Sequence, residues 1–531
     1  MEASHARELT RAWLPVALLT ALGAGLRFAA IGEQGFWIDE IITVELVSKP
    51  LGAMLRALPG AESTPPLYYL LAWPWSRAVG SDEAGLRSLS ALAGTLTIPV
   101  CYAAGRALVS YRAGVIVAAL SAVSPLLVWY SQEARAYGLF VLFGALSFLF
   151  FSRALADPST RQLGLWTAAS SLTLLTHYFG AFLIGVEALV LLYRHRSRPT
   201  WLATGGIGVI AVAVLPLAAY QVVHASSRWI RDVDLAGRIE EAVRQLLLPS
   251  PQSIFAGAGV AEGAGRRLWP VAVALILGAV VVLLTLGTIR ERRGGLVALG
   301  VGSATVALPV LVSLAAAVAT DGRGDVFLYR NVIVAWLPLA IVLGAALGAR
   351  RAGALGIVAA AILTASSLAV VLHIATTPRL QRDDWELVSK ALGVPDGQVV
   401  LLSPSWQIAA LEHEVGEFRP LGRGTSTAQV DLLVRRHVPS YSPAVESLSL
   451  PPEFERVETQ VLQNWVLTRF RAPERTYLDA VDAGVSPADA SYVPLVRVRE
   501  GTPRVPTVKK TNQRAIGISG MSIRGKAAST E

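Results

Sequence analysis

Long apolar runs recur along the first 370 residues of this chain and constrain its fold more than any other feature. Crossing the roughly 30 Å hydrocarbon core of a bilayer takes about 20 residues of helix, because a lipid-exposed backbone must satisfy its own hydrogen bonds. Of the 531 residues, 53% are hydrophobic and 16% are charged. A soluble domain carries about 25% charged residues. The sequence therefore predicts an all-α polytopic membrane protein.

The apolar runs predict about eleven transmembrane helices. They lie near residues 13–31, 85–108, 113–130, 137–155, 162–177, 179–194, 201–223, 268–289, 296–319, 331–349 and 352–372. Residues 65–75 are also apolar, but this segment is short and rich in proline and aromatic residues. We expect it to be interfacial or re-entrant rather than a crossing.

Arginines set the predicted orientation, because short cytoplasmic loops collect Lys and Arg. With the eleven spans, the loop arginines fall on one side, which we expect to be cytoplasmic: Arg7, Arg11, Arg106, Arg112, Arg153, Arg161, Arg194, Arg196, Arg198, Arg290, Arg292, Arg293, Arg350 and Arg351. These arginines and a basic tail account for most of the net charge of +9, so we expect contact with membrane lipid and no binding of nucleic acid.

Two further residues bear on the membrane domain. Arg27, near the end of the first apolar run, is expected to snorkel outward. The single cysteine, Cys101, lies inside a predicted span, which excludes a disulfide framework and a cysteine-based metal site.

Composition divides the chain into regions. We predict a cytoplasmic N-terminus at 1–12, a transmembrane domain at 13–372 with a first outer loop at 32–84 and a mobile outer loop at 224–267, a small α/β extracytoplasmic domain at 383–471, and a mostly disordered tail at 473–531. Within the small domain, Asp384 is expected to cap a helix, residues 398–402 to form a buried strand, and the segments flanking Gln463 and Asn464 to pair as a hairpin.

Two adjacent carboxylates, Asp39 and Glu40, follow Trp37 where the first apolar run ends. On the outer face of a membrane such a group is a general base, a metal ligand, a proton-relay site or an interfacial charge. Asp is also a common helix cap, and the residues from Ile41 onward favour a helix. From this pair alone, catalysis and capping are equal alternatives.

A second polar cluster lies at the next predicted outer turn, where loops are ordinarily short and neutral. It contains Gln132, Glu133, Arg135 and Tyr137 within a few positions. Glu133 and Arg135 are also compatible with a simple local ion pair. Because this turn and Asp39 fall on the same predicted face, a functional role for both is favoured.

Three more positions are candidates for chemistry. His177 marks a later outer turn, although a lone histidine near an interface is usually benign. Tyr329 and Arg330 open a late apolar run, where an arginine either snorkels or grips a phosphate through its planar fork. Glu187 lies inside a predicted span, where ionisable groups are expensive and often functional, but the sequence assigns it no role.

Aromatic platforms with carboxylates suit a sugar, and arginine at the hydrocarbon boundary suits a lipid phosphate. The order and spacing of the motifs resemble the GT-C superfamily of polyprenyl-phosphate-sugar glycosyltransferases, in the branch of the protein O-mannosyltransferases and lipid A aminoarabinose transferases. The resemblance covers roughly residues 13–470 and rests on these motifs: Asp39-Glu40, Thr64-Pro65-Pro66-Leu67-Tyr68-Tyr69, Tyr130 to Tyr137, His177-Tyr178, Arg330 to Pro338, and Asp384-Trp385 to Leu392. The chain departs from the protein O-mannosyltransferases in having Thr64 where His is common and in lacking their β-trefoil insertion.

The resemblance implies a GT-C-like fold and transfer of a sugar from a polyprenyl-phosphate donor to a glycan, lipid or protein hydroxyl. The active site and C-terminal domain would be extracytoplasmic, in a bacterial-type plasma (inner) membrane. Asp39 would be the general base and Glu40 its helper, with inversion at the anomeric carbon. The implied substrate-binding residues are Tyr68, Gln132, Glu133, Arg135, Tyr137, His177, Tyr329 and Arg330. No cofactor is firmly implied, and a divalent cation, Mg²⁺ or Mn²⁺, stays open.

Two rival functions fit part of the sequence. A transporter or flippase of a lipid-linked sugar explains the spans and arginines, but favours charges at mid-membrane, where Glu187 is the best candidate. A non-catalytic polysaccharide-binding membrane scaffold is the second rival. Neither explains the acidic outer loops as well as an enzyme does.

Overall fold

The computed structural model describes residues 2–224, 235–248, 269–320, 327–393, 398–403, 407–416, 418–421, 424–435, 450–479 and 493–497. They belong to two compact units, a helical one at Met1–Asp383 and one at Asp384–Glu531 that contains a sheet. Most of the predicted mobile loop at 224–267 lies outside the described residues; residues 235–248 within it contain a helix.

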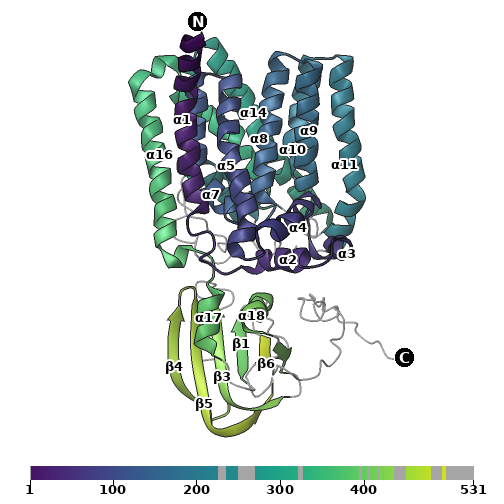
Figure 1. Ribbon diagram of the computed structural model, residues 1–531, viewed down its shortest axis with the longest axis vertical. Helices are drawn as coiled ribbons and strands as arrows, with labels where there is room; N and C mark the ends of the chain where they lie inside the picture. The colour runs from purple at the N-terminus through teal and green to yellow at the C-terminus, as the bar shows by residue number, and fades with distance from the viewer. Residues whose placement is uncertain are drawn as a thin grey trace, which may run out of the picture. The chain divides into compact units, whose positions relative to one another are not determined.

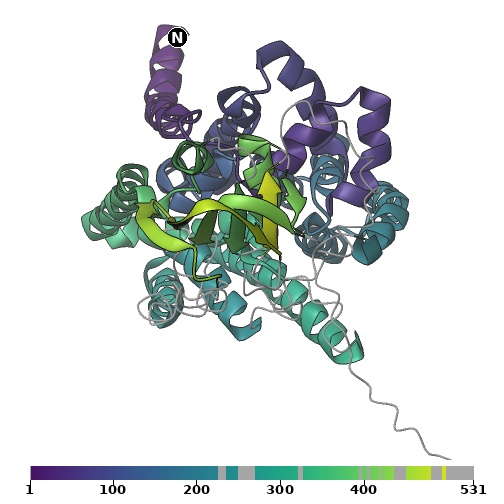
Figure 2. The same cartoon turned by 90° about the horizontal axis from the view of Figure 1, so that it is seen from below.

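The helical unit has a helix at every predicted span (Figure 1). Its elements are α1 (Glu2–Phe28), α2 (Ile38–Val47), α3 (Leu51–Ala61), α4 (Leu67–Val79), α5 (Glu83–Leu108), α6 (Tyr111–Val123), α7 (Pro125–Ser131), α8 (Tyr137–Ala156), α9 (Thr160–Thr176), α10 (Gly180–Arg194), α11 (Arg198–His224), α12 (Leu235–Leu247), α13 (Trp269–Leu286), α14 (Ile289–Thr320), η3 (Tyr329–Ala335), α15 (Trp336–Leu347), η4 (Arg350–Ala352), α16 (Gly353–Thr376) and η5 (Pro378–Leu380). Several of the long helices are seen end-on in Figure 2, so they run side by side.

Among the described residues, six helical segments are long and apolar enough to cross a membrane. They are Glu83–Leu108, Tyr137–Ala156, Arg198–Val222, Ile289–Ala319, Tyr329–Leu347 and Arg350–Thr376. The pair α6 and α7, bent by 55°, makes a seventh, and Trp13–Phe28 and Pro270–Leu286 are shorter apolar helices. The chain is therefore a multi-pass membrane protein, and the number of eleven spans stays a prediction.

The bend between α6 and α7 has a local cause. Pro125 opens α7, and Ser124 before it is extended, with ψ 120°. A proline disfavours the helical conformation of the residue that precedes it, so the chain leaves α6 at this point. The break frees carbonyl groups at the end of α6 for other donors.

Arg27 uses these carbonyl groups. Its Nη1 donates to the carbonyl of Ala122 at 2.9 Å and its Nη2 to that of Ser121 at 2.9 Å. The side chain is fully buried. The prediction that Arg27 snorkels outward is therefore wrong, because the broken helix offers buried acceptors that an uninterrupted helix would not.

The predicted first outer loop, 32–84, is mostly helical. Its helices α2, α3 and α4 lie across one end of the bundle, and the N-terminal end of α1 lies at the other (Figure 1). The helix expected from Ile41 onward is interrupted before Pro50, which precedes α3. The cap of α2 is Trp37, so Asp39 lies within its first turn rather than at the capping position.

The second unit has a six-stranded mixed sheet in the order β2-β6-β1-β3-β5-β4 and two helices, α17 (Trp385–Leu392) and α18 (Ile408–Val415). The strands are β1 (Val399–Ser403), β2 (Phe418–Pro420), β3 (Thr425–Arg435), β4 (Glu455–Leu462), β5 (Trp465–Leu478) and β6 (Val493–Arg497). Strands β1 and β3 are parallel, and the other pairs are antiparallel.

Local signals in this unit were predictive. Asp384 caps α17 by accepting from the amide of Leu387, β1 is buried throughout, and β4 pairs with β5 around Gln463, whose φ is 48°. The predicted tail at 473–531 is wrong in part. Residues 473–478 extend β5 and 493–497 form β6, because both pair with neighbouring strands of this sheet.

Candidate active site

Asp39 and Arg330 form an ion pair at the end of the helical unit where α2 lies. Oδ2 of Asp39 is 3.1 Å from Nη1 of Arg330, although the residues are 291 positions apart. The Asp39 side chain is 24% exposed and that of Arg330 is 17% exposed. The predicted base and the predicted phosphate-binding arginine therefore meet in one partly accessible place.

Tyrosines surround this pair on one side. The guanidinium of Arg330 lies 5.9 Å from the ring centre of Tyr137. The ring of Tyr130 packs edge-on against Tyr137 at 4.8 Å, and its hydroxyl is 3.2 Å from that of Tyr329. Aromatic packing of this kind restricts the arginine and leaves polar hydroxyl groups beside it.

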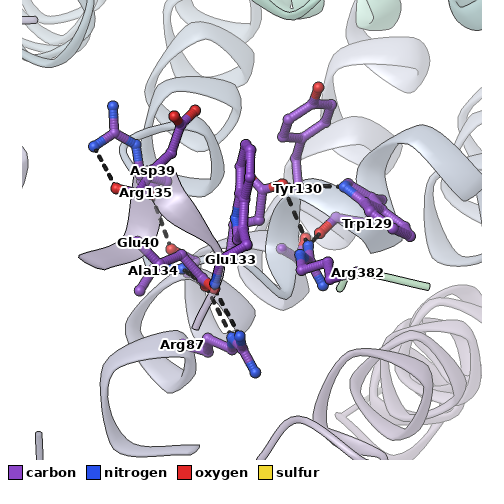
Figure 3. A network of polar contacts seen from close by, with 12 residues as sticks. Asp39, Glu40, Arg87, Trp129, Tyr130, Glu133, Ala134, Arg135 and Arg382 are labelled. Carbon is purple, nitrogen blue, oxygen red and sulfur yellow. Dashed lines mark hydrogen bonds and ion pairs between the residues drawn. The ribbon is translucent and has the colours of Figure 1, made fainter. Parts of the chain in front are cut away.

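Glu40 turns away from its neighbour and is fully buried (Figure 3). Its two carboxylate oxygens accept from Arg87, with Nε at 2.8 Å and Nη2 at 2.6 Å. They also accept from the amides of Ala134 at 2.8 Å and Trp37 at 3.3 Å. Burial alone raises the pKa of Glu40, but Arg87, Arg382 and the Ala134 amide bring that pKa below its usual value. Glu40 is thus a charged carboxylate whose two oxygens both accept hydrogen bonds, and it links α2 to α5 and to the turn at Ala134.

Arg87 is a site residue that the sequence reasoning did not single out. Besides Glu40 it donates to the carbonyl groups of Ile31, Gln34 and Gly35, so one guanidinium holds the chain that leads from α1 into α2. Its signal was an arginine at the start of the predicted span 85–108, next to the first outer loop.

Arg135 holds the backbone of Asp39. It pairs with both carboxylate oxygens of Glu62, at 2.5 and 3.0 Å, and its Nη1 donates to the backbone carbonyl of Asp39 at 3.1 Å and to the hydroxyl of Tyr69 at 3.1 Å. The local ion pair between Glu133 and Arg135 considered from the sequence is replaced by this pair with Glu62. Figure 3 shows the contact with Asp39.

Glu133 is buried between Trp129 and Arg382 (Figure 3). Its Oε1 accepts from Trp129 Nε1 at 3.0 Å and is 3.3 Å from Arg382 Nη2. Its Oε2 is buried and has no hydrogen-bond partner among the described residues. Burial raises the pKa of Glu133 to about 7, with Arg382 opposing the rise and Glu40 adding to it. Arg382 was also missed, although it lies two residues before the Asp384-Trp385 motif, because that motif was assigned to the small domain.

The other predicted site residues lie in the walls around the pair. The side-chain amide of Gln132 donates to the carbonyl of Leu26 at 3.2 Å and so closes the end of α1. His177 stacks on Phe140 with ring centres 4.6 Å apart, and burial with nearby arginines lowers its pKa to about 3. Tyr68 is fully buried. Direct contact of these three with substrate stays a prediction.

Glu187 has partners within the helical bundle. Its Oε2 accepts from Ser147 Oγ at 2.6 Å and from Trp166 Nε1 at 2.8 Å. The three residues come from α10, α8 and α9, so the carboxyl group ties these helices together. This contact accounts for an ionisable residue at mid-bundle without a transport pathway.

No group of three or more His, Cys, Asp or Glu that is suited to hold a metal ion occurs in the described part of the chain. Mg²⁺ or Mn²⁺ as a cofactor stays a prediction.

Residues 63–224 match the family model described as Dolichyl-phosphate-mannose-protein mannosyltransferase. The matched segment contains Glu133, Arg135 and His177 and begins just after Glu62. This match confirms the resemblance to the GT-C glycosyltransferases that the sequence motifs indicated. No curated protein matches the chain by sequence.

Solved structures show distant similarity. The protein O-mannosyltransferase Pmt1-Pmt2 complex of S. cerevisiae bound to the sugar donor is 16% identical over 40% of this chain and 33% of the yeast chain, with a TM-score of 0.31. ArnT from Cupriavidus metallidurans bound to undecaprenyl phosphate is 14% identical over 86% of this chain and 97% of its own, with a TM-score of 0.39. The oligosaccharyltransferase AglB from Archaeoglobus fulgidus, in complex with an inhibitory peptide and a dolichol-phosphate, is 12% identical over 77% and 64%, with a TM-score of 0.39. Identities this low do not carry a substrate from those proteins to this chain.

Proposed function

We propose that this protein is a glycosyltransferase that moves a sugar from a polyprenyl-phosphate-linked donor to an acceptor hydroxyl. The observation that carries the proposal is the ion pair between Asp39 and Arg330, which keeps partial exposure while the acid–arginine pairs around it are buried. The family match at residues 63–224 supports the reaction class.

Arg330 binds the donor phosphate. Arg330 lies in η3, at the start of a late apolar run, a position that suits a phosphate on a lipid tail. Its planar guanidinium offers two parallel N–H groups to phosphate oxygens. As the bond between the anomeric carbon and the phosphate oxygen breaks, negative charge grows on the polyprenyl phosphate. A fixed cation in a partly dry site stabilises that charge.

Asp39 is the general base. The acceptor hydroxyl attacks the anomeric carbon, its proton passes to the Asp39 carboxylate, and polyprenyl phosphate leaves with the bonding electrons. A single displacement of this kind inverts the anomeric carbon. Proton transfer to a positioned base contributes typically about 10² to 10⁴-fold.

Glu40, Arg135 and Glu62 position the base rather than touch the reacting atoms. Glu40 fixes the first turn of α2 through Arg87, and Arg135 fixes the Asp39 carbonyl. This division replaces the helper role predicted for Glu40 and the substrate contact predicted for Arg135. Asp39 and Arg330 do not select the substrates. Other contacts decide which sugar, which polyprenol and which glycan, lipid or protein acceptor the protein uses.

We place the reaction on the extracytoplasmic face of a bacterial-type plasma membrane. The proposal rests on the arginine distribution, which assigns the opposite helix ends to the cytoplasm. The C-terminal unit would then also be extracytoplasmic.

The test is transfer by purified protein in lipid nanodiscs, with a panel of polyprenyl-phosphate hexoses and pentoses, mannose first. Release of polyprenyl phosphate is measured for the wild type, Asp39→Asn and Asp82→Asn. Asp82 is a matched control, because it caps α5 and its replacement by Asn keeps a capping side chain. Loss of release in Asp39→Asn alone supports the enzyme; equal release in all three contradicts it, and Asp39-independent movement of donor between leaflets would favour the flippase.

A further inference from the structure

Arg382 makes an unusual set of contacts just before the helical unit ends at Asp383. Its guanidinium stacks over the ring of Trp129 at 4.3 Å, and its Nη2 donates to the Trp129 carbonyl at 3.1 Å. The same nitrogen is 3.3 Å from Oε1 of Glu133. A residue 253 positions from Trp129 thus contacts both Trp129, in α7, and Glu133, in the turn that follows α7.

The two oxygens of Glu133 differ as a result. Oε1 is shared by Trp129 Nε1 and Arg382, whereas Oε2 is buried and has no hydrogen-bond partner among the described residues. A buried carboxylate oxygen without a partner costs free energy unless a proton or a ligand group reaches it. An unmodified carboxylate oxygen in this position is free to accept a hydrogen bond from a ligand hydroxyl group.

Glu133 also interacts electrostatically with Asp39 and Arg330. The charged groups that act on it are Arg382, Glu40, Arg330 and Asp39. Glu133 and the Asp39–Arg330 pair therefore belong to one charged region of the helical unit, in which Glu133 is fully buried.

We propose that Arg382 is a positioning residue for substrate: it fixes Oε1 of Glu133 against Trp129, and so directs Oε2 to a hydroxyl of the donor sugar. This inference rests on the proposed transferase function and names the group that recognises the sugar. Arginine is required rather than lysine, because stacking on an indole and donation to two acceptors from one plane need a guanidinium.

The experiment measures how much a polyprenyl-phosphate sugar raises the Tm of the protein, which requires no turnover. The donor is the member of the panel above that raises the wild-type Tm most. The variants are Arg382→Gln, Arg382→Lys, Glu133→Gln and the double variant Glu133→Gln/Arg382→Gln. KM for the same donor is measured beside kcat.

Arg77 is the matched control. It stacks over Trp73 at 3.6 Å and donates to the Trp73 carbonyl at 2.7 Å, as Arg382 does with Trp129. Its other hydrogen bonds go to backbone carbonyl groups and a serine hydroxyl rather than to a carboxylate. Arg77→Gln removes the same kind of packing outside the proposed site. We expect it to keep the donor-induced shift and the wild-type KM.

We expect Arg382→Gln to raise KM for the donor roughly tenfold or more and to shrink the Tm shift, with Arg382→Lys only partly restoring both. Contact energies of neighbours in one network are not additive, so the double variant should be no worse than Glu133→Gln. An unchanged shift in Arg382→Gln, or fully additive losses in the double variant, overturns the inference alone. No transfer by the wild type despite a normal shift contradicts the proposed reaction instead, and no shift with any donor contradicts both.

Discussion

Asp39 and Glu40 are adjacent in sequence, yet their carboxylates bind two different arginines: Oδ2 of Asp39 lies 3.1 Å from Arg330 Nη1, and Oε2 of Glu40 lies 2.6 Å from Arg87 Nη2. The first pair is partly exposed and the second is buried. Two residues that a sequence motif treats as one unit therefore do different work.

This division predicts opposite phenotypes. Asp39→Asn should fold normally, with thermal unfolding close to the wild type, and lose roughly 10² to 10⁴-fold in transfer rate. Glu40→Gln leaves the Arg87 charge buried without its counter-ion, so it should lower stability by about 3–5 kcal/mol. Thermal unfolding and transfer rate are measured on the same preparations.

The control for Glu40→Gln is Glu45→Gln, which lies on the same helix but is exposed. It should change stability by less than about 0.5 kcal/mol. A Glu40→Gln protein as stable as Glu45→Gln would contradict the buried-link role.

Arg330→Lys should lower kcat substantially while keeping the positive charge. Lysine offers a point charge, not a fork, so it loses the two-point contact with the phosphate and the packing over Tyr137. We expect a loss of roughly tenfold or more in kcat, with donor binding weakened less. Single-turnover measurements separate the two, and a kcat equal to the wild type would argue against a role in leaving-group stabilisation.

The buried Glu133 predicts a pH dependence of stability. Its pKa is about 7 in the folded protein, above the usual 4.5, so between these values the folded state binds more protons than the unfolded chain. Stability from this group is therefore full below about pH 4.5 and falls as pH rises to about 7. Melting curves from pH 4 to 8 should show this decline in the wild type and a weaker one in Glu133→Gln. Parallel curves would contradict a raised pKa of Glu133 in the folded protein.

Glu187→Gln should be tolerated. The amide oxygen still accepts from Ser147 and Trp166, so we expect transfer within about twofold of the wild type and a similar Tm. Glu187→Leu removes the acceptor from both donors and should lower the Tm. A Glu187→Gln protein that folds normally but has lost function would revive the transporter reading, which depends on a titrating group at mid-membrane.

Much of the fold followed from local sequence. Each predicted span contains a helix, the cap at Asp384 and the hairpin around Gln463 formed as expected, and residues 65–75 form a short helix that is not among the candidate spans. These features depend on hydropathy, capping and turn chemistry, which act over a few residues. The burial of Arg27 could not be predicted from local sequence, because its acceptors come from the break between α6 and α7.

The sequence by itself determined which side chains gather at one end of the helices, since alternating spans bring the outer turns with Asp39, Glu133, His177 and Arg330 to the same face. Tertiary structure alone decided which carboxylate meets which arginine. The pairs join residues 47, 73 and 291 positions apart, for Glu40 with Arg87, Glu62 with Arg135, and Asp39 with Arg330. Local sequence does not assign these partners, because each pair joins segments that only packing brings together. Packing also buried two of the three pairs and left Asp39 with Arg330 partly exposed.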